Sequence, residues 1–351
     1  MSDTQIITDT LARIFDETLD RKARLAAESG TFARAAWQSL AETGMLHPAV
    51  PDALGGAGGT LADEYEVLVA TGRAGAPLPI ADTILAGWLL STAGREVPAG
   101  PLAAVAAGAG LRAVRRGDTL VLEGRARRVP WGRDLAGLVV LAEDAGRTQV
   151  ALVPMPAGRV ENGANLAGEP RDTLVFEGAA VSAVPADLPP GVDAGALRRR
   201  GALGRAALMA GAMETAVDLA VRYANDRVQF GKPIGKQQSV QHALAILAVE
   251  AAAGAMAAAR AYRAVADAAA DADLHCAVAK SRAGEAAGRA AGIAHQVHGA
   301  IGFTREHTLH FVTRRLWSWR EEYGNESAWT LEIGRLACAA GGPGLWPMLA
   351  G

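Results

Sequence analysis

The chain has 351 residues, of which 50% are hydrophobic but only 5% are aromatic. This length is at or above the size at which a single hydrophobic core stops growing, so we expect two or three packed subdomains. Lysine and arginine total 35 against 37 aspartates and glutamates, and this balance excludes the basic surface of a nucleic-acid binder.

Cys276 and Cys338 are too few for a disulfide scaffold and lack metal-ligand spacing, which favours a reducing cytoplasm. The first residues are acidic and amphipathic, without the basic-then-apolar order of a signal peptide. No uncharged apolar run reaches the roughly 18 residues of a membrane span. We therefore expect a cytoplasmic protein with no membrane span.

Apolar residues follow helical spacing from residue 4 to about residue 95. We expect Gly44 to end the second helix and residues 51–60 to form a loop. A third helix should begin near Leu61, break at two prolines and give way to a further apolar stretch at 81–94.

The period changes to two between about 100 and 190, which predicts a small β-domain. A Gly-Asp turn is expected at 117–118. The other strand-like runs lie at 135–142, 148–155 and 174–181.

Long alanine-rich helices are predicted after residue 193, and four of them favour a four-helix bundle. The predicted spans are 193–226, 237–269, 271–300 and 304–340. The predicted fold class is therefore α+β, with an N-terminal helical domain at 1–98, a middle β-domain at 99–190 and a C-terminal bundle at 191–351.

Most local motifs have two interpretations when taken alone. GGAGG at 55–59 is either a phosphate-binding loop or a turn between helices, and it lacks the Lys-Ser/Thr of a P-loop. His295 with His298, and His307 with His310, are either metal ligands or packing residues. Since no acidic or cysteine set lies near them, we expect packing and no metal site.

Two stretches resemble the signatures of the acyl-CoA dehydrogenase family. The first is RYANDRVQFGKPIGKQQSVQHALA at 222–245, and the second is HQVHGAIGFTREHTLHFVTRRLW at 295–317. Residues 37–59 are similar to the family's helical entry domain, and residues 123–142 look like its middle-domain strand pair. The resemblance covers essentially the whole chain and implies the family's α–β–α fold.

The resemblance implies oxidation of an acyl-CoA thioester to the 2,3-enoyl-CoA. In the family a carboxylate removes the α-proton, the β-hydrogen leaves as hydride to N5 of FAD, and fixed donors stabilise the thioester oxygen. Electrons then pass to an electron-transfer flavoprotein. The implied cofactor is FAD.

The implied cofactor-binding residues follow from the matched signatures. Arg227 matches an arginine that reaches the FAD diphosphate of a neighbouring subunit, which suits a bidentate cation. Phe230 matches a residue on the adenine side, and Arg205 matches an arginine near the acyl end of the pocket. The remaining matches are Gln238 at the head of the next helix, and Gln296, Gly299 and Ala300 in a turn that approaches the cofactor.

The middle of the chain departs from the family pattern. Residues 100–114 contain neither the Thr-Glu nor the Gly-Ser-Asp pair that contacts flavin and substrate in the family. The tryptophan usually beside the isoalloxazine has no clear match. Arg128, Val129 or Pro130 falls near its place, and Trp131 is displaced by a few residues.

The catalytic base also departs from the pattern. Of the two positions that the family uses, one holds Tyr323, followed by the expected Gly324, and the other holds Gly204. The pKa of tyrosine is near 10, about six units above that of glutamate. A shift of that size would require roughly 8 kcal/mol of additional stabilisation of the charged form. Glu322 is the base if the turn is shifted by one residue, and otherwise it is a solvated carboxylate. Glu326 also flanks the position.

Two functions are compatible with this pattern. The first is a FAD-dependent acyl-CoA dehydrogenase, with FAD at a subunit interface and a bulky or polycyclic acyl-CoA as substrate. The second is a non-catalytic subunit of an α2β2 heterotetramer, in which another family member supplies the base. The resemblance implies that the chain assembles either as a homo-oligomer or as a heterotetramer with a second acyl-CoA dehydrogenase. A purely structural helical protein would require both signatures to be coincidental.

Overall fold

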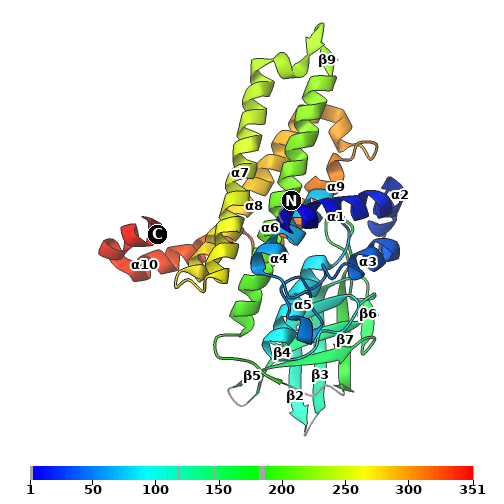
Figure 1. Cartoon of the computed structure of the whole chain (residues 1–351), viewed down its shortest axis with the longest axis vertical. Coiled ribbons are helices and arrows are strands. Elements are labelled where there is room, and N and C mark those ends of the chain that lie inside the picture. The colour runs from blue at the N-terminus through cyan, green and yellow to red at the C-terminus, as the bar shows by residue number, and fades with distance from the viewer. Residues whose placement is uncertain (1–2, 109, 117–118, 145–146, 182–185, 351) are drawn as a thin grey trace. The chain divides into compact units, whose positions relative to one another are not determined.

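The computed structural model describes residues 3–108, 110–116, 119–144, 147–181 and 186–350. The chain divides into two compact units (Figure 1). The first unit comprises Met1–Thr71 and Ala76–Gly201, and the second comprises Gly72–Gly75 and Ala202–Gly351. The predicted turn at 117–118 lies outside the described residues, and the predicted three-domain boundaries remain a prediction.

The first unit begins with helices, as the periodicity indicated. Asp20 caps α2, a short helix that we did not predict, by accepting a hydrogen bond from the Ala23 amide at 2.7 Å. The predicted helix end at Gly44 is wrong by three residues, because α3 ends at Ala41 and Gly44 takes a left-handed φ of +73° in the next turn. The helices are α1 Asp3–Thr18, α2 Arg21–Ala27, α3 Arg34–Ala41, the 3₁₀ turn η1 Asp52–Leu54, α4 Leu61–Ala74 and α5 Ile80–Thr92.

Helix α5 connects the helical part of this unit to its sheets. The predicted break between α4 and α5 is confirmed, and Pro79 occupies the N-cap position of α5. Most of α5 is buried, and it packs on β1 and β4. Thr83 Oγ1 accepts a hydrogen bond from the Leu102 amide at 3.0 Å, which ties α5 to the start of β1.

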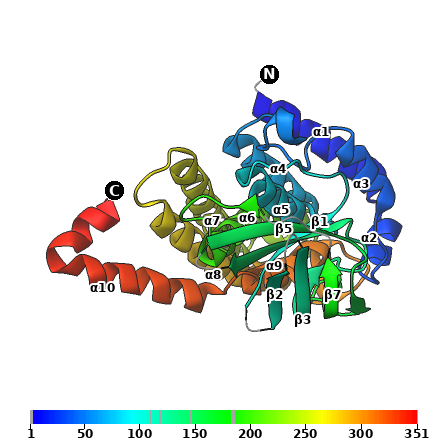
Figure 2. The same cartoon turned by 90° about the horizontal axis from the view of Figure 1, so that it is seen from below.

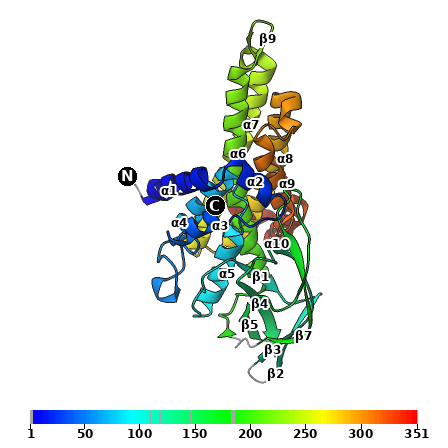
Figure 3. The ribbon, with the colours of Figure 1, turned by 90° about the vertical axis from the view of Figure 1, so that its right-hand side faces the viewer.

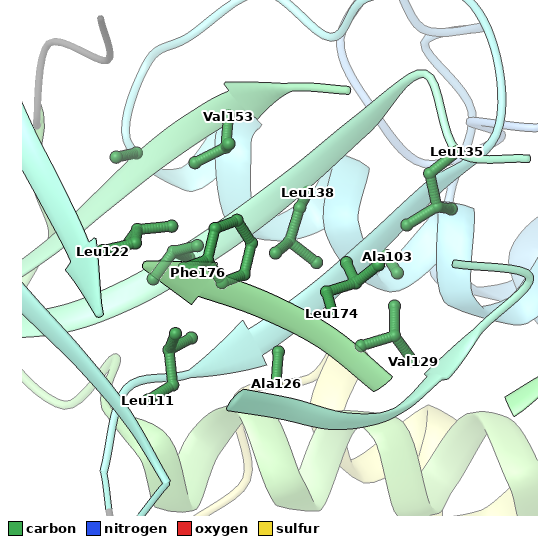
Figure 4. Packing of buried hydrophobic residues seen from close by; sticks show 12 residues of the cluster. Ala103, Leu111, Leu122, Ala126, Val129, Leu135, Leu138, Val153, Leu174 and Phe176 are labelled. Atoms are coloured by element: carbon green, nitrogen blue, oxygen red, sulfur yellow. The ribbon is translucent and has the colours of Figure 1, made fainter. Parts of the chain in front are cut away.

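Two four-stranded sheets follow α5 in the first unit. Their orders are β1-β4-β5-β8 and β2-β3-β7-β6, and β1 with β4 is a parallel pair. The inner faces enclose one apolar cluster, in which Leu138 and Val153 of one sheet meet Leu174 and Phe176 of the other (Figure 4). The strands are β1 Leu102–Ala106, β2 Leu111–Arg116, β3 Thr119–Pro130, β4 Gly137–Asp144, β5 Arg147–Pro154, β6 Arg159–Glu161, β7 Arg171–Val181 and β8 Ala186–Asp187.

Long helices dominate the second unit, and α6 and α7 run side by side to a short hairpin at their joined ends (Figures 1 and 3). Small residues allow close approach, since a Cβ on Gly254 of α7 would lie 2.7 Å from Met213 Cε of α6. The elements are α6 Ala194–Asp226, whose residues up to Gly201 belong to the first unit, β9 Val228–Gln229, β10 Lys232–Pro233, η2 Ile234–Lys236, α7 Gln238–Ala266, α8 Ala272–His298, η3 Gly299–Phe303, α9 Leu309–Glu321 and α10 Glu326–Ala350.

The prediction of one helix over 304–340 is wrong. The chain forms α9 and α10 instead, separated by the turn at 322–325. Tyr323 and Gly324 both have positive φ there, which no continuous right-handed helix can contain. Helix α10 packs on α8 near its start and then leads away from it, with a kink at Gly341 (Figure 2).

Among the described residues, α7 is the one helix long and apolar enough to cross a membrane, and 28% of its most apolar 18-residue window is buried. Glu250 lies within that helix and pairs with Arg282 and with Arg289 of α8. A helix of a packed bundle meets the same criteria. The absence of a membrane span stays a prediction.

Candidate functional site

The three residues predicted to be catalytic lie together at the turn between α9 and α10. Glu322 follows the last residue of α9, and its Oε2 accepts a hydrogen bond from Arg205 Nε of α6 at 2.5 Å. The Arg205 side chain is 3% exposed, while that of Glu322 is 19% exposed. The Arg205 guanidinium lies 5.3 Å from the centroid of the Tyr323 ring, within the range of a cation–π contact.

The backbone of this turn is left-handed at two successive residues. Tyr323 has φ +58° and Gly324 has φ +98°. Glycine accepts this conformation readily, whereas a side chain costs about 1–2 kcal/mol. The indole Nε1 of the buried Trp329 donates to the Tyr323 carbonyl at 3.1 Å and helps to hold the turn in place.

Lys280 of α8 supports the same turn from inside the bundle. Its side chain is buried, and its Nζ donates to the carbonyls of Arg320 at 2.7 Å and of Gly324 at 2.6 Å. Burial lowers the pKa of Lys280 to about 8, while the charge of Glu322 raises it in part. The amine therefore joins the end of α9 to the residue that follows Tyr323.

Glu326, the other acidic neighbour of this position, is bound to Arg320. Arg320 Nε donates to Glu326 Oε2 at 2.9 Å, and a second nitrogen of the guanidinium donates to Oε1. These hydrogen bonds lower the pKa of Glu326 below its ordinary value. The pair joins α9 to α10, which gives Glu326 a structural role at this turn.

The residues of the first signature lie at the exposed hairpin between α6 and α7. Phe230 is 92% exposed and has φ +53°, and Gly231 completes the turn with φ +77°. Arg227, which follows the last residue of α6, and Gln238, at the first position of α7, are also exposed. The hairpin thus presents a guanidinium, an aromatic ring and a carboxamide to solvent.

The residues of the second signature lie where α8 ends. Gln296, Gly299 and Ala300 are exposed, and Gly299 has φ +62° with open space where a Cβ would lie. The Tyr223 ring of α6 stacks on His298 with centroids 4.7 Å apart. Since Tyr223 lies about one turn before Arg227, this contact places the two signatures side by side within the second unit.

The signature histidines are engaged in packing contacts. His298 Nδ1 donates to the Ala294 carbonyl at 2.7 Å, and His295 Nε2 lies 2.9 Å from Thr313 Oγ1. His307 meets His298 edge-on, with ring centroids 4.5 Å apart. Burial lowers the pKa of His298, so its ring is neutral near pH 7.

The glycine-rich loop at 55–59 is a packed turn, and the phosphate-binding interpretation is wrong. The Gly58 amide donates to the Val50 carbonyl at 2.8 Å, and the Gly59 amide donates to the Pro48 carbonyl at 2.9 Å. A Cβ on Gly56 would lie 2.1 Å from the Val50 oxygen. The amides that would bind a phosphate therefore already have backbone partners.

Trp131 is packed inside the first unit and does not present its ring to a cofactor. It is 1% exposed, and its ring meets Phe32 edge-on at 5.2 Å. Arg128, which occupies the neighbourhood of the family tryptophan, is exposed instead and has φ +57°.

A small cavity in the first unit has a volume of about 40 Å³. Its lining includes His47 and the buried ion pair of Arg200 with Glu64, whose atoms lie 2.7 Å apart. Burial lowers the pKa of His47 to about 4. This volume holds a few water molecules and is far too small for an acyl-CoA.

The sequence did not point to Lys280, and it indicated Trp329 only as a core or interface residue, whereas both hold the turn. Lys280 is the only lysine of α8, and a single lysine within an alanine-rich helix was the available signal. Nothing local in the sequence indicated that its partners were carbonyls in the last turn of α9 and just after it.

Comparisons with family profiles and with curated proteins both match acyl-CoA dehydrogenases. The acyl-CoA dehydrogenase N-terminal domain profile matches residues 1–98, and the C-terminal domain profile matches residues 198–335. The chain is 31% identical over 302 residues to acyl-CoA dehydrogenase IpdE2 of Mycobacterium tuberculosis, covering 84% of this chain and 83% of that protein.

Two solved structures have a similar fold. A variant of the Tcur3481–Tcur3483 steroid ACAD is 25% identical, with a TM-score of 0.85 and coverage of 96% of this chain and 98% of that chain. The ChsE4–ChsE5 complex of Mycobacterium tuberculosis is 24% identical, with a TM-score of 0.86 and coverage of 97% and 98%.

Proposed function

Because the chain belongs to the acyl-CoA dehydrogenase family, we propose that it is a flavoprotein that converts an acyl-CoA thioester to its 2,3-enoyl-CoA. The observation that carries this proposal is the Arg205–Glu322 pair. It places a carboxylate one residue before the position of the usual base. The hydrogen bond from Arg205 fixes the orientation of this carboxylate, and a general base must be held within hydrogen-bond reach of the proton that it takes.

The exposed residues of the two signatures fit FAD. Arg227 suits the diphosphate, the exposed Phe230 ring suits the adenine, and the open turn at Gly299 allows main chain to approach the cofactor. Gln238, Gln296 and Ala300 complete this set. When bound, FAD supplies the acceptor for the hydrogen that leaves the β-carbon.

The residues of the turn have distinct parts in the proposed reaction. Glu322 takes the α-proton at its carboxylate. Arg205 orients that carboxylate, while Tyr323 packs its ring against the Arg205 guanidinium. Lys280 holds the backbone on both sides of the base, which limits its movement during proton transfer.

We expect the purified protein to be yellow and its flavin absorbance to bleach when acyl-CoA is added without oxygen. The similarity to a steroid ACAD supports a polycyclic acyl-CoA as the substrate. We expect a straight-chain acyl-CoA of similar mass to bleach the flavin more slowly than a polycyclic acyl-CoA does. A colourless protein that gains no flavin from added FAD would refute the proposal.

We propose that a second subunit covers the outer face of α7. Ile246, Val249 and Met256 are 51%, 66% and 73% exposed, and their spacing places them along one side of the helix. The partner is either a second copy or another acyl-CoA dehydrogenase, and an electron-transfer flavoprotein would reoxidise the flavin. We place this assembly in the cytoplasm.

The alternative function is that of a non-catalytic subunit in a heterotetramer, and the presence of Tyr323 at the position of the usual base supports it. Production together with a second acyl-CoA dehydrogenase of the same organism tests this idea. If the alternative holds, the two chains will copurify and only the pair will bleach. A single chain that is a fully active homomer would exclude it.

A further inference from the structure

Strand β3 contains a β-bulge at two successive arginines. Ala126 is opposite Leu174 of β7, and Val129 is opposite Asp172, so Arg127 and Arg128 together face one residue of β7. The extra residue shifts the alternation of side chains by one position. Arg128 has φ +57°, the left-handed backbone of the bulge.

The bulge places both arginines on the outer face of the sheet. Ala126 and Val129 point into the apolar cluster, at 4% and 0% exposure (Figure 4). Arg127 and Arg128 between them are both exposed. In a regular strand Arg128 would share the inner face with Ala126, so the bulge is what allows two adjacent cations here.

Acidic residues nearby do not neutralise this pair. Glu161 of β6 lies across β7 from the bulge, and it is bound by both Arg125 and Arg159. Arg127 and Arg128 have no hydrogen-bond or ion-pair partner among the described residues. Strand β2 pairs with β3 only as far as Gly124, so it brings no partner either.

We propose that Arg127 and Arg128 form a binding site for a phosphate group of a nucleotide ligand. Guanidinium groups bind phosphate oxygens in a bidentate fashion, and two adjacent ones suit a diphosphate. The diphosphate of FAD and the phosphates of coenzyme A are the two sources. This choice of sources rests on the proposed function, whereas the anion site itself does not.

Calorimetric titration with inorganic pyrophosphate tests the site on the full chain. The double variant Arg127→Gln with Arg128→Gly should bind at least about tenfold more weakly, the loss expected for a charge-assisted contact. Arg147→Gln is the control, because Arg147 is an exposed strand arginine that already pairs with Asp187. Binding by the control should match that of the unaltered protein.

Thermal melting separates binding from folding. Glycine suits the left-handed backbone at position 128, so Arg128→Gly should raise Tm or leave it unchanged while it weakens pyrophosphate binding. A residue with a purely structural role would not give that combination. Equal affinity of the double variant and the unaltered protein, or no binding of millimolar pyrophosphate by either, would overturn the proposal.

Titrations with FAD and with coenzyme A identify the source. If the double variant binds FAD more weakly but coenzyme A normally, the site binds the diphosphate of FAD. If it binds coenzyme A more weakly but FAD normally, the site binds the phosphates of coenzyme A. If the unaltered protein binds neither nucleotide, the proposed function fails, while the pyrophosphate result still decides the site.

Discussion

Replacing Glu322 with glutamine is expected to slow flavin reduction by about 10³-fold or more, within the range of lost general base catalysis. The amide cannot accept the α-proton, yet it keeps the size and a hydrogen-bonding oxygen for Arg205. Flavin content should not change, because Glu322 is not among the residues of the two signatures. Anaerobic stopped-flow absorbance with the acyl-CoA that bleaches the flavin measures the rate.

Glu321→Gln provides the matched control. Glu321 is exposed, and its Oε2 accepts a hydrogen bond from Asn325 Nδ2 at 3.3 Å. Its variant should reduce flavin at the unaltered rate. If Glu322→Gln is equally active, the base is not Glu322, and Tyr323, Glu326 or a partner subunit must supply it.

Replacing Lys280 with methionine is expected to destabilise the protein by about 2 kcal/mol at neutral pH. The change leaves the partly buried carbonyls of Arg320 and Gly324 without their donor, at about 1–3 kcal/mol each. Removal of a buried ammonium offsets part of this loss. Chemical denaturation measures the difference, and Lys236→Met, at an exposed lysine of the same unit, should have little effect.

The stability difference between the unaltered protein and Lys280→Met should depend on pH, because the Lys280 amine changes its charge. Burial lowers the pKa of Lys280 from 10.5 to about 8, so between these values the folded protein loses a proton that the unfolded chain keeps. Rising pH therefore stabilises the fold through this group. The unaltered protein and Lys280→Met should differ in their free energy of unfolding by about 3 kcal/mol more at pH 10.5 than at pH 8. A constant gap would show that the amine is not desolvated as the structure indicates.

The same variant should also loosen the turn locally. Hydrogen exchange of the segment at 320–326 is expected to accelerate in Lys280→Met. Exchange in α6 that occurs through local opening, and not through global unfolding, should stay unchanged. Uniform acceleration across the second unit would indicate that Lys280 contributes only general stability. Local acceleration would connect its two hydrogen bonds to the position of Glu322.

Periodicity and composition determined the fold class and most of the elements. Helical spacing and period-two alternation depend on which side of one element faces the core, and this pattern is visible within a few residues of sequence. Hence α6, α7 and α8 were predicted within a few residues of their ends, and the signatures identified the family. The prediction failed at 304–340, where a turn that is stabilised by distant residues interrupts a helical pattern.

Only the tertiary structure decided what surrounds the candidate base. Arg205 and Glu322 are separated by 117 positions, and Lys280 by 44 positions from Gly324. No local spacing encodes such contacts, because they depend on how α6 and α8 pack against the turn. The bulge at Arg127 and Arg128 is a similar case, since it is defined by the pairing of β3 with β7 and cannot be seen in either strand alone.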